Sequence, residues 1–326
     1  MQNTPKTPPK ASILSEKLFI LLKWGVFATI FFVLFRFLKG ERVNIIELIH
    51  EFRRLTIAEN FMYLITVVLL IFFNWGFEAK KWQILVRKIE NISFIDAYQS
   101  VLVGLSLGFI SPANLGDFAG RLMKLKSKNR SEGIGLVLLG NGIQFYVSIL
   151  FGAIAYVVVL STKDSKIDQI IFIGVILTLI LGVMVFTFRG KITAFFTNFQ
   201  MVKKYENHLK ALSEFDLADF KDIFLWAVLR YLTFSLQFVL VLIVFQVPLP
   251  FLQLWAISCL VLLFKTIIPP INFVTDLGVR EFSALHFFNL YSVNNTSVFT
   301  ATFFLWLLNI LFPVIIGGFL FLKSKL

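Results

Sequence analysis

The chain has few of the residues that build disulfides, metal centres and cofactor sites. It contains one cysteine, Cys259, and three histidines in 326 residues. A single cysteine excludes a disulfide within the chain, and the zinc-binding spacings HExxH and CxxC do not occur. The phosphate-binding loop of ATP-driven motors, GxxxxGK[ST], does not occur either. We therefore expect no metal ion, no cofactor and no enzymatic activity.

Charged residues are also scarce. They make up 15% of the chain, against about 25% in a typical soluble domain, whereas hydrophobic residues make up 58%. This balance predicts an all-α polytopic membrane protein. The net charge of +12 would suggest nucleic acid in a soluble protein. Here the basic residues lie between apolar segments, as they do in cytoplasmic loops, so we expect no nucleic-acid partner.

Six apolar stretches are long enough to cross a bilayer, whose core of about 30 Å needs roughly 20 helical residues. They are residues 18 to 38, 58 to 77, 134 to 160, 168 to 188, 223 to 247 and 297 to 322. Residues 1 to 17 contain several Pro and Lys and are predicted to form a disordered tail. Residues 18 to 326 are predicted to form one transmembrane domain.

Two further apolar stretches are shorter and run into a repeated polar signature. Residues 94 to 110 lead into SPANLGDFAGR, and residues 251 to 268 lead into PPINFVTDLGVRE. Each is interpreted as one arm of a re-entrant hairpin, over about residues 94 to 125 and 251 to 290. Irregular backbone at membrane depth persists only inside protein or beside a wet cavity, so the tips should face inward. The predicted tip residues are Pro112, Gly116, Pro269, Pro270 and Gly278.

The distribution of basic residues predicts how the chain lies in the membrane. Residues 80 to 88, 121 to 130 and 189 to 221 are rich in Lys and Arg, which favours a cytoplasmic position. With both termini cytoplasmic, the two hairpins enter from opposite sides. This is the inverted-repeat arrangement of transporters, in which substrates bind between the repeats. We expect a multi-pass protein of the cell (inner) membrane; its oligomeric state is not predicted.

Three short motifs carry a family resemblance. They are EAKKW at residues 78 to 82, the Pro-x-x-x-Gly-Asp-x-x-x-Arg run from Pro112 to Arg121, and LGVRE at residues 277 to 281. In this order they resemble the lysylphosphatidylglycerol synthase transmembrane-region family of flippase-like proteins, over nearly the whole chain after about residue 15. The resemblance implies a module that moves a phospholipid between leaflets. The chain ends four residues after the last predicted span, so we expect neither a synthase domain nor aminoacyl transfer.

The two signatures place an Arg one helical turn after an Asp. Arg121 and Arg280 are natural partners of a lipid phosphate because a guanidinium binds two oxygens at once. Asp117 and Asp276, four residues earlier, can neutralise them when no lipid is bound. Alternatively, the pairs only lock the hairpin tips to neighbouring helices. The complete set of candidate head-group residues is Arg121, Arg280, Asp117, Asp276, Asn114, Asn272, Glu281, Lys265 and Arg230.

Some of these candidates have a second interpretation. Glu281 is a proton or cation site, or a cap on the returning helix. Lys265 meets a lipid phosphate, or it pairs with Asp276 or Glu281. Arg230 faces the bundle, or its side chain reaches back to the cytoplasmic interface.

Other polar and small residues recur at helical spacing. Asn141, Gln144 and Ser148 share one helix face, which is expected to point into the bundle. Gly104 and Gly108, with Ser100 one turn earlier, predict close packing of two helices. Glu78 and Asn74, beside Trp75 and Trp82, are interpreted first as an interfacial anchor and second as part of a cavity.

Two functions fit the sequence. The first is a flippase-like protein that moves a phospholipid or a lipid-linked polar group through a polar cavity between the hairpins. Its partner is then a membrane lipid. The second is a non-transporting membrane partner of a separate lipid-modifying or glycan-assembling enzyme.

Overall fold

The computed structural model describes residues 58 to 127, 132 to 160, 166 to 188, 215 to 268 and 273 to 324, together with Gly25 and residues 190 to 191. The regular elements of these ranges are helices. They are α3 (Ala58–Val86), α4 (Phe94–Ile110), η1 (Pro112–Asn114), α5 (Leu115–Leu122), α6 (Gly133–Leu160), α7 (Lys166–Thr187), α11 (Leu217–Val244), α12 (Phe251–Ile267), α13 (Phe273–Asn289), α14 (Asn295–Trp306), η3 (Leu307–Leu311) and α15 (Phe312–Lys323). The predicted tail and the predicted span at residues 18 to 38 lie outside this description.

Four helices among the described residues are long and apolar enough to cross a membrane. They are Asn60–Val86, Gly133–Val159, Leu217–Val244 and Asn295–Lys323, the last running through α14, η3 and α15. The two predicted hairpin arms, α4 and α12, are shorter, with 17 residues each. The apolar part of α7 is Phe172–Met184. The predicted all-α polytopic architecture is confirmed, whereas the re-entrant placement and opposite orientation of the hairpins remain predictions.

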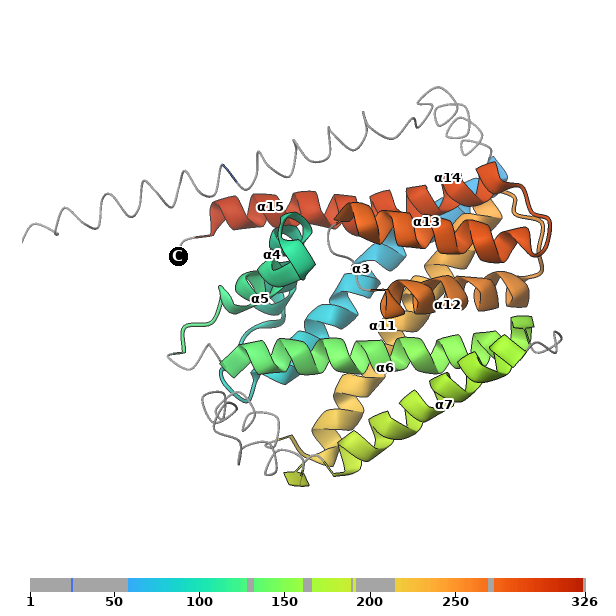
Figure 1. The fold of residues 1–326 in the computed structure, drawn as a ribbon. Helices are drawn as coiled ribbons and strands as arrows, with labels where there is room; N and C mark the ends of the chain where they lie inside the picture. The colour runs from blue at the N-terminus through green and yellow to red at the C-terminus, as the bar shows by residue number, and fades with distance from the viewer. Residues whose placement is uncertain are drawn as a thin grey trace, which may run out of the picture.

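The long helices form a bundle with a hairpin near each end (Figure 1). α3 and α11 lie side by side through the middle of the bundle. The run from α14 to α15 passes along one side of it. α4 and α5 pack against each other and against α15, while α12 packs between α6 and α13. α7 packs on α6 and lies at the periphery.

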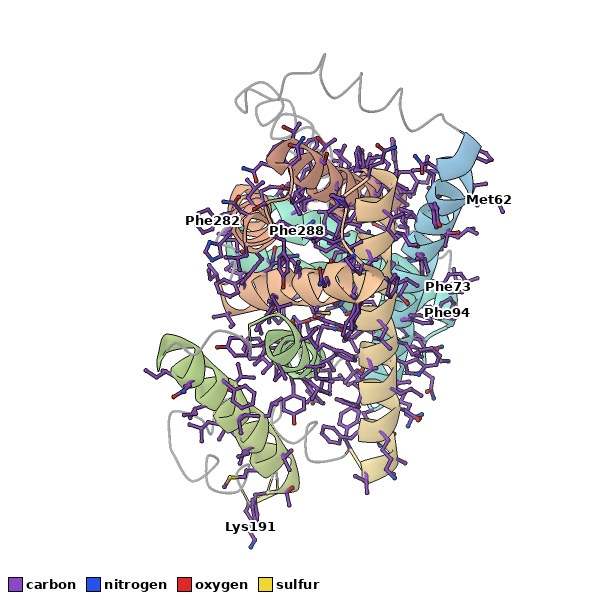
Figure 2. All side chains as sticks on the ribbon, turned by 90° about the vertical axis from the view of Figure 1, so that its right-hand side faces the viewer. Met62, Phe73, Phe94, Lys191, Phe282 and Phe288 are labelled. Atoms are coloured by element: carbon purple, nitrogen blue, oxygen red, sulfur yellow. The ribbon has the colours of Figure 1, made fainter. Side chains whose placement is uncertain are left out.

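Large apolar side chains cover the outside of the bundle as well as its core. Met62 and Phe73 of α3 are 71% and 55% exposed and project outward, whereas Phe288 is fully buried (Figure 2). Soluble monomers rarely expose apolar patches of this extent. Such a surface is stable when lipid covers it, because hydrocarbon tails do not penalise apolar side chains.

A charged cap begins α11, and one of its carboxylates also contacts the chain just beyond the end of α3. The Asp216 side chain accepts a hydrogen bond from the Asp219 backbone N–H, and the Asp219 side chain accepts one from the Asp216 backbone N–H, which completes a capping box. Lys88 lies just beyond α3, and its Nζ is 2.8 Å from Oδ2 of the buried Asp219. This contact joins one end of each central helix.

Glycines bring the two helices of the first hairpin into backbone contact. A Cβ atom on Gly116 would overlap the Leu107 carbonyl, and one on Gly120 would overlap the Gly104 backbone. The close packing predicted from Gly104 and Gly108 is therefore confirmed, and its partner surface is α5.

The tip of this hairpin is a tight turn. Ala113 and Asn114 both adopt left-handed backbone angles, with φ of 51° and 56°. Pro112 opens the turn, since it cannot continue the hydrogen bonding of α4. The Gly116 N–H donates to Ser111 Oγ at 2.7 Å, which begins α5. Pro112 therefore begins this turn, and Gly116 lies in the first turn of α5 beyond it.

Candidate functional site

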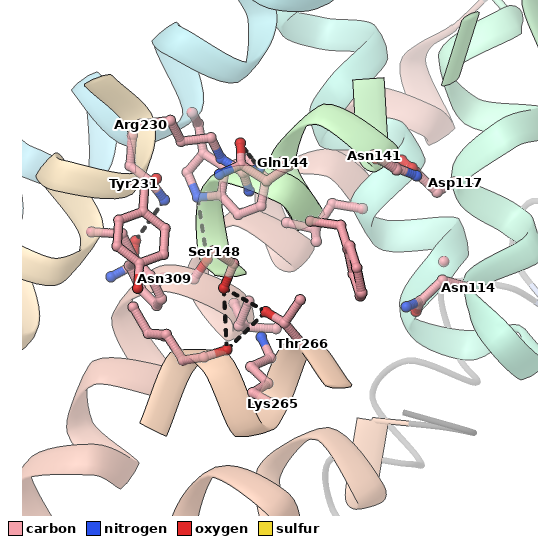
Figure 3. Close-up of a pocket in the computed structure, with 18 of the residues that line it drawn as sticks. Asn114, Asp117, Asn141, Gln144, Ser148, Arg230, Tyr231, Lys265, Thr266 and Asn309 are labelled. Carbon is pink, nitrogen blue, oxygen red and sulfur yellow. Dashed lines mark hydrogen bonds between the residues drawn. The ribbon is translucent and has the colours of Figure 1, made fainter. Parts of the chain in front are cut away.

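A cavity of about 560 Å³ opens among α3, the first hairpin, α6, α11, α12 and the segment from α14 to η3 (Figure 3). Its wall combines aromatic and aliphatic side chains with many polar ones. The described polar lining residues are Asn74, Asn114, Asp117, Arg121, Asn141, Gln144, Ser148, Arg230, Tyr231, Lys265, Thr266 and Asn309. Both hairpins contribute: Asn114, Asp117 and Arg121 come from the first, and Lys265 and Thr266 from the second.

Three cations meet at one carboxylate at the edge of this cavity. Glu78 Oε1 is 2.8 Å from Arg121 Nη1, and its Oε2 is 2.7 Å from Lys81 Nζ and 2.9 Å from Arg230 Nη1. The Glu78 and Lys81 side chains are each 1% exposed. Buried charges are stable only when paired, so these contacts hold α3, α5 and α11 in a fixed relation.

The Asp and Arg of the first signature pair as predicted. Arg121 Nε donates to both oxygens of Asp117, at 2.8 and 3.0 Å. Asp117 lies against the glycine face of α4, where its Oδ1 occupies the space that a Cβ atom on Gly104 would need. Arg121 is thus held by Asp117 and Glu78 while it still lines the cavity. We call Glu78, Lys81, Asp117, Arg121 and Arg230 the Glu78 cluster.

Tryptophan rings hold the two arginines from the side. The Arg230 guanidinium lies 5.2 Å from the ring centre of Trp75, and that of Arg121 lies 5.9 Å from Trp82. Such cation–π contacts stabilise a cation without consuming its N–H donors. The donors stay available for oxygen atoms.

The polar face predicted on α6 points into the cavity. Gln144 Oε1 accepts from Lys81 Nζ at 3.3 Å and from Arg230 Nη1 at 3.4 Å. Ser148 Oγ lies 2.8 Å from Thr266 Oγ1 of α12. Asn141, the third member of this face, is exposed and lines the cavity.

A π-helical turn supplies a backbone acceptor to the same region. Pro313 has no N–H, so it cannot donate to the carbonyl of Asn309 four residues earlier. Trp75 Nε1 donates to that carbonyl instead, at 3.2 Å. The turn lies within η3, and such turns often mark functional sites.

The Asn309 side chain belongs to a buried hydrogen-bond chain across the bundle. Asn74 Nδ2 donates to Asn309 Oδ1 at 3.1 Å, and Asn309 Nδ2 donates to Gln237 Oε1. Gln237 Nε2 in turn donates to the Val67 carbonyl at 2.7 Å. α3, α11 and η3 are thereby joined next to the cavity.

The second signature lies elsewhere. Arg280 is fully buried in α13, and Glu281 accepts a hydrogen bond from Thr302 Oγ1 of α14. Neither belongs to the described lining of the cavity. Gly278 is an exposed residue within α13. Pro269, Pro270 and Asn272 lie outside the described residues, as does the side chain of Asp276. The head-group role of this signature remains a prediction.

The first interpretation of Glu78 was wrong, because an interfacial anchor would be exposed and this side chain is buried in an ion cluster. Lys81 and Asn309 were not predicted as site residues at all. Their signal in the sequence was local: a Glu and a Lys three residues apart, and an asparagine four residues before a proline, each within an apolar helix.

Comparison with known proteins gives one family. The chain matches the family described as the lysylphosphatidylglycerol synthase TM region over residues 20 to 317. A search of curated proteins found no match. The matched range includes both hairpins and every described residue that lines the cavity.

Proposed function

This chain belongs to the lysylphosphatidylglycerol synthase TM region family, and we propose that it moves a phospholipid or a lipid-linked polar group between the two leaflets of a membrane. The family places it among integral membrane proteins of the lipid-related, flippase-like type. The matched region is the membrane part of the family rather than a catalytic domain, so the proposal assigns the chain no chemical step.

The observation that carries this proposal is a cavity in the apolar bundle whose lining contains cationic side chains from three elements. A phosphate-bearing head group cannot enter hydrocarbon without large cost, and it needs polar groups along its whole path. The cavity offers Arg121 from the first hairpin, Lys265 from the second and Arg230 from α11. Its volume of about 560 Å³ suits a small polar group and excludes a complete lipid. The acyl chains would therefore remain outside the bundle.

The chemistry of head-group binding follows from the two arginines. A guanidinium donates parallel hydrogen bonds to two phosphate oxygens, and charge-assisted bonds of this kind are short and strong. Asn114 and Asn141 add amide groups that can bind the hydroxyls of a head group. Glu78 and Asp117 hold the arginines in place.

We further propose that the hairpins enter the cell (inner) membrane from opposite sides, with both termini in the cytoplasm. The cavity would then lie near the middle of the bilayer, between two repeats. Movement of the hairpins relative to α3 and α11 would open it to each leaflet in turn.

Leaflet exchange in liposomes tests the proposal. The purified chain is reconstituted into liposomes that contain fluorescent phosphatidylglycerol. An impermeant quencher is added outside, and the fraction of the fluorescence that it removes is followed with time. Arg121→Gln is expected to lose most of the exchange seen with wild type, and Arg280→Gln tests the second signature in the same way.

Lys80→Gln is the matched control, because Lys80 lies one residue from Lys81 but bonds only Gln83 among its described contacts. Exchange by Arg121→Gln at the wild-type rate contradicts the proposed path. If wild type behaves like protein-free liposomes, the non-transporting partner becomes the better hypothesis.

A further inference from the structure

Three buried amides form a hydrogen-bond chain that runs in one direction and ends at the cavity. Gln237 Nε2 donates to the Val67 carbonyl at 2.7 Å. Asn309 Nδ2 donates to Gln237 Oε1, and Asn74 Nδ2 donates to Asn309 Oδ1 at 3.1 Å. A backbone carbonyl can only accept a hydrogen bond, so Val67 fixes which end of the Gln237 amide faces it. Gln237 then fixes Asn309, and Asn309 fixes Asn74.

This fixed order leaves one acceptor at the end of the chain. Asn74 Oδ1 is buried, and no described residue donates a hydrogen bond to it. Asn74 is 3% exposed and is one of the residues that line the cavity. A buried amide oxygen without a donor is unfavourable and rare in folded proteins. A molecule in the cavity can satisfy it with an O–H or N–H group, whereas a second acceptor cannot.

Asn74 lies one helical turn from the carboxylate that holds the arginines of the cavity. Asn74 and Glu78 are four residues apart on α3, so they share a face and are about 6 Å apart along the helix axis. Glu78 contacts Arg121 Nη1 at 2.8 Å and Arg230 Nη1 at 2.9 Å. The Arg230 guanidinium lies over the ring of Trp75, the residue after Asn74. A phosphate bound by these arginines therefore leaves the rest of its head group within reach of Asn74.

We infer that Asn74 selects a lipid phosphodiester whose head group carries an O–H or N–H donor on the second or third carbon from the phosphate. The inference rests on the proposed function and specifies its substrate class. Glycerol and ethanolamine head groups carry such a donor, whereas the choline nitrogen carries methyl groups and no hydrogen. Sites built to hydrogen-bond a substrate reject analogues that lack the bonding group, because the buried polar group of the site is then left without a partner.

Binding can be measured without transport by comparing two pairs of short-chain lipids. The purified full chain in a neutral detergent is titrated with each lipid. Thermal unfolding gives the affinity, because a ligand that binds the folded state raises the unfolding midpoint with its concentration. Phosphatidylethanolamine is paired with phosphatidylcholine, and phosphatidylglycerol with phosphatidylpropanol. The two lipids of a pair have the same net charge, and only the first of each pair carries a donor on its head group.

The first lipid of each pair is expected to bind about tenfold more tightly than the second, or better. Equal affinities within both pairs overturn the inference and indicate that a bound water satisfies Asn74 Oδ1. A preference within one pair only overturns it as well. Such a result would reflect another difference between those two lipids, such as the bulk of the choline methyl groups.

Two variants test the acceptor and the chain that orients it. Asn74→Leu removes the acceptor with little change in volume, and it is expected to bind both lipids of each pair equally. Gln237→Leu keeps Asn74 but removes the amide that orients Asn309, and Gln237 is not among the described lining residues. The Asn74 amide can then turn over and offer an N–H, so the preference is expected to fall several-fold.

Thr178→Val of α7 is the control, because it removes a polar group that lies outside the described lining and should keep the preference. A wild-type preference in Asn74→Leu overturns the inference, and one in Gln237→Leu overturns the orienting role of the chain. If either variant does not fold, the comparison of the two lipid pairs with wild type decides.

The outcome is independent of the transport assay. Selection of donor-bearing lipids without leaflet exchange keeps this inference and refutes the proposed function. Leaflet exchange of all four lipids at equal rates, with equal affinities within each pair, does the reverse.

Discussion

Arg121 of α5 donates from Nη1 to Oε1 of Glu78 in α3 at 2.8 Å, across 43 residues of sequence. The same guanidinium lines the cavity and is held by Asp117. Arg121 therefore fits both interpretations of the first signature, as a lock on the hairpin and as a head-group partner. A ligand that draws Arg121 away from Glu78 would also loosen the hairpin from α3, which links binding to movement.

Removing the shared carboxylate should destabilise the bundle. Glu78→Gln leaves Lys81, Arg121 and Arg230 with one anion fewer, and breaking a buried pair in this way costs about 3 to 5 kcal/mol. The unfolding midpoint in detergent, in the absence of anionic lipid, should fall clearly. Asp222→Asn is the control, because Asp222 is an exposed carboxylate of α11. Equal midpoints for the two variants would show that the cluster contributes little to stability.

The first hairpin should not tolerate a methyl group between its helices. Gly116→Ala places a Cβ atom where it overlaps the Leu107 carbonyl. A backbone carbonyl, unlike a side chain, cannot rotate out of the way. Overpacking of this kind costs about 1 to 3 kcal/mol. Gly142→Ala of α6 is the matched change, since nothing lies within 4 Å of a Cβ atom there. We expect a lower midpoint for the first variant and an unchanged or higher one for the second, by scanning fluorimetry.

The indole of Trp75 should be needed for its N–H as well as its ring. Trp75→Phe keeps an aromatic ring for Arg230 but leaves the Asn309 carbonyl without its donor, at a cost of about 1 to 3 kcal/mol. Pro313→Ala restores a backbone N–H four residues after Asn309. The double variant should therefore recover part of the lost stability. If the stability changes of the two single variants simply add in the double variant, this account of the π-helical turn is wrong.

The sequence was sufficient for the architecture and for the first hairpin. Charges and helix breakers are so unfavourable in apolar sequence that Pro112, Asp117 and Arg121 stood out, and an i, i+4 pair needs no knowledge of the rest of the fold. The small residues of α4 indicated close packing by their spacing alone. The second signature was equally visible, yet residues 269 to 272 lie outside the described part of the chain and Arg280 is not among the residues that line the cavity, so its role stays a prediction.

The centre of the site could not be predicted in the same way. Glu78 lies near the end of an apolar run between two tryptophans, a pattern that also suits a membrane interface. Arg230, which is 152 residues later, completes the Glu78 cluster. It reaches Glu78 only because α3 and α11 lie side by side. Asn309 likewise depends on Trp75 from another helix. Local patterns identify residues that need partners, whereas the packing of distant helices decides which partners they find.

Blocking the cavity tests the central claim most directly. Cys259 is fully buried and is the only cysteine of the chain, so an introduced thiol can be labelled selectively. Asn141→Cys places one on the exposed cavity face of α6, and Gly174→Cys places one on the exposed surface of α7 as the control. After reaction with a bulky methanethiosulfonate, phosphatidylglycerol exchange by Asn141→Cys should fall to the level of protein-free liposomes, while Gly174→Cys stays active. Exchange by fully labelled Asn141→Cys at its unlabelled rate would contradict a lipid path through this cavity.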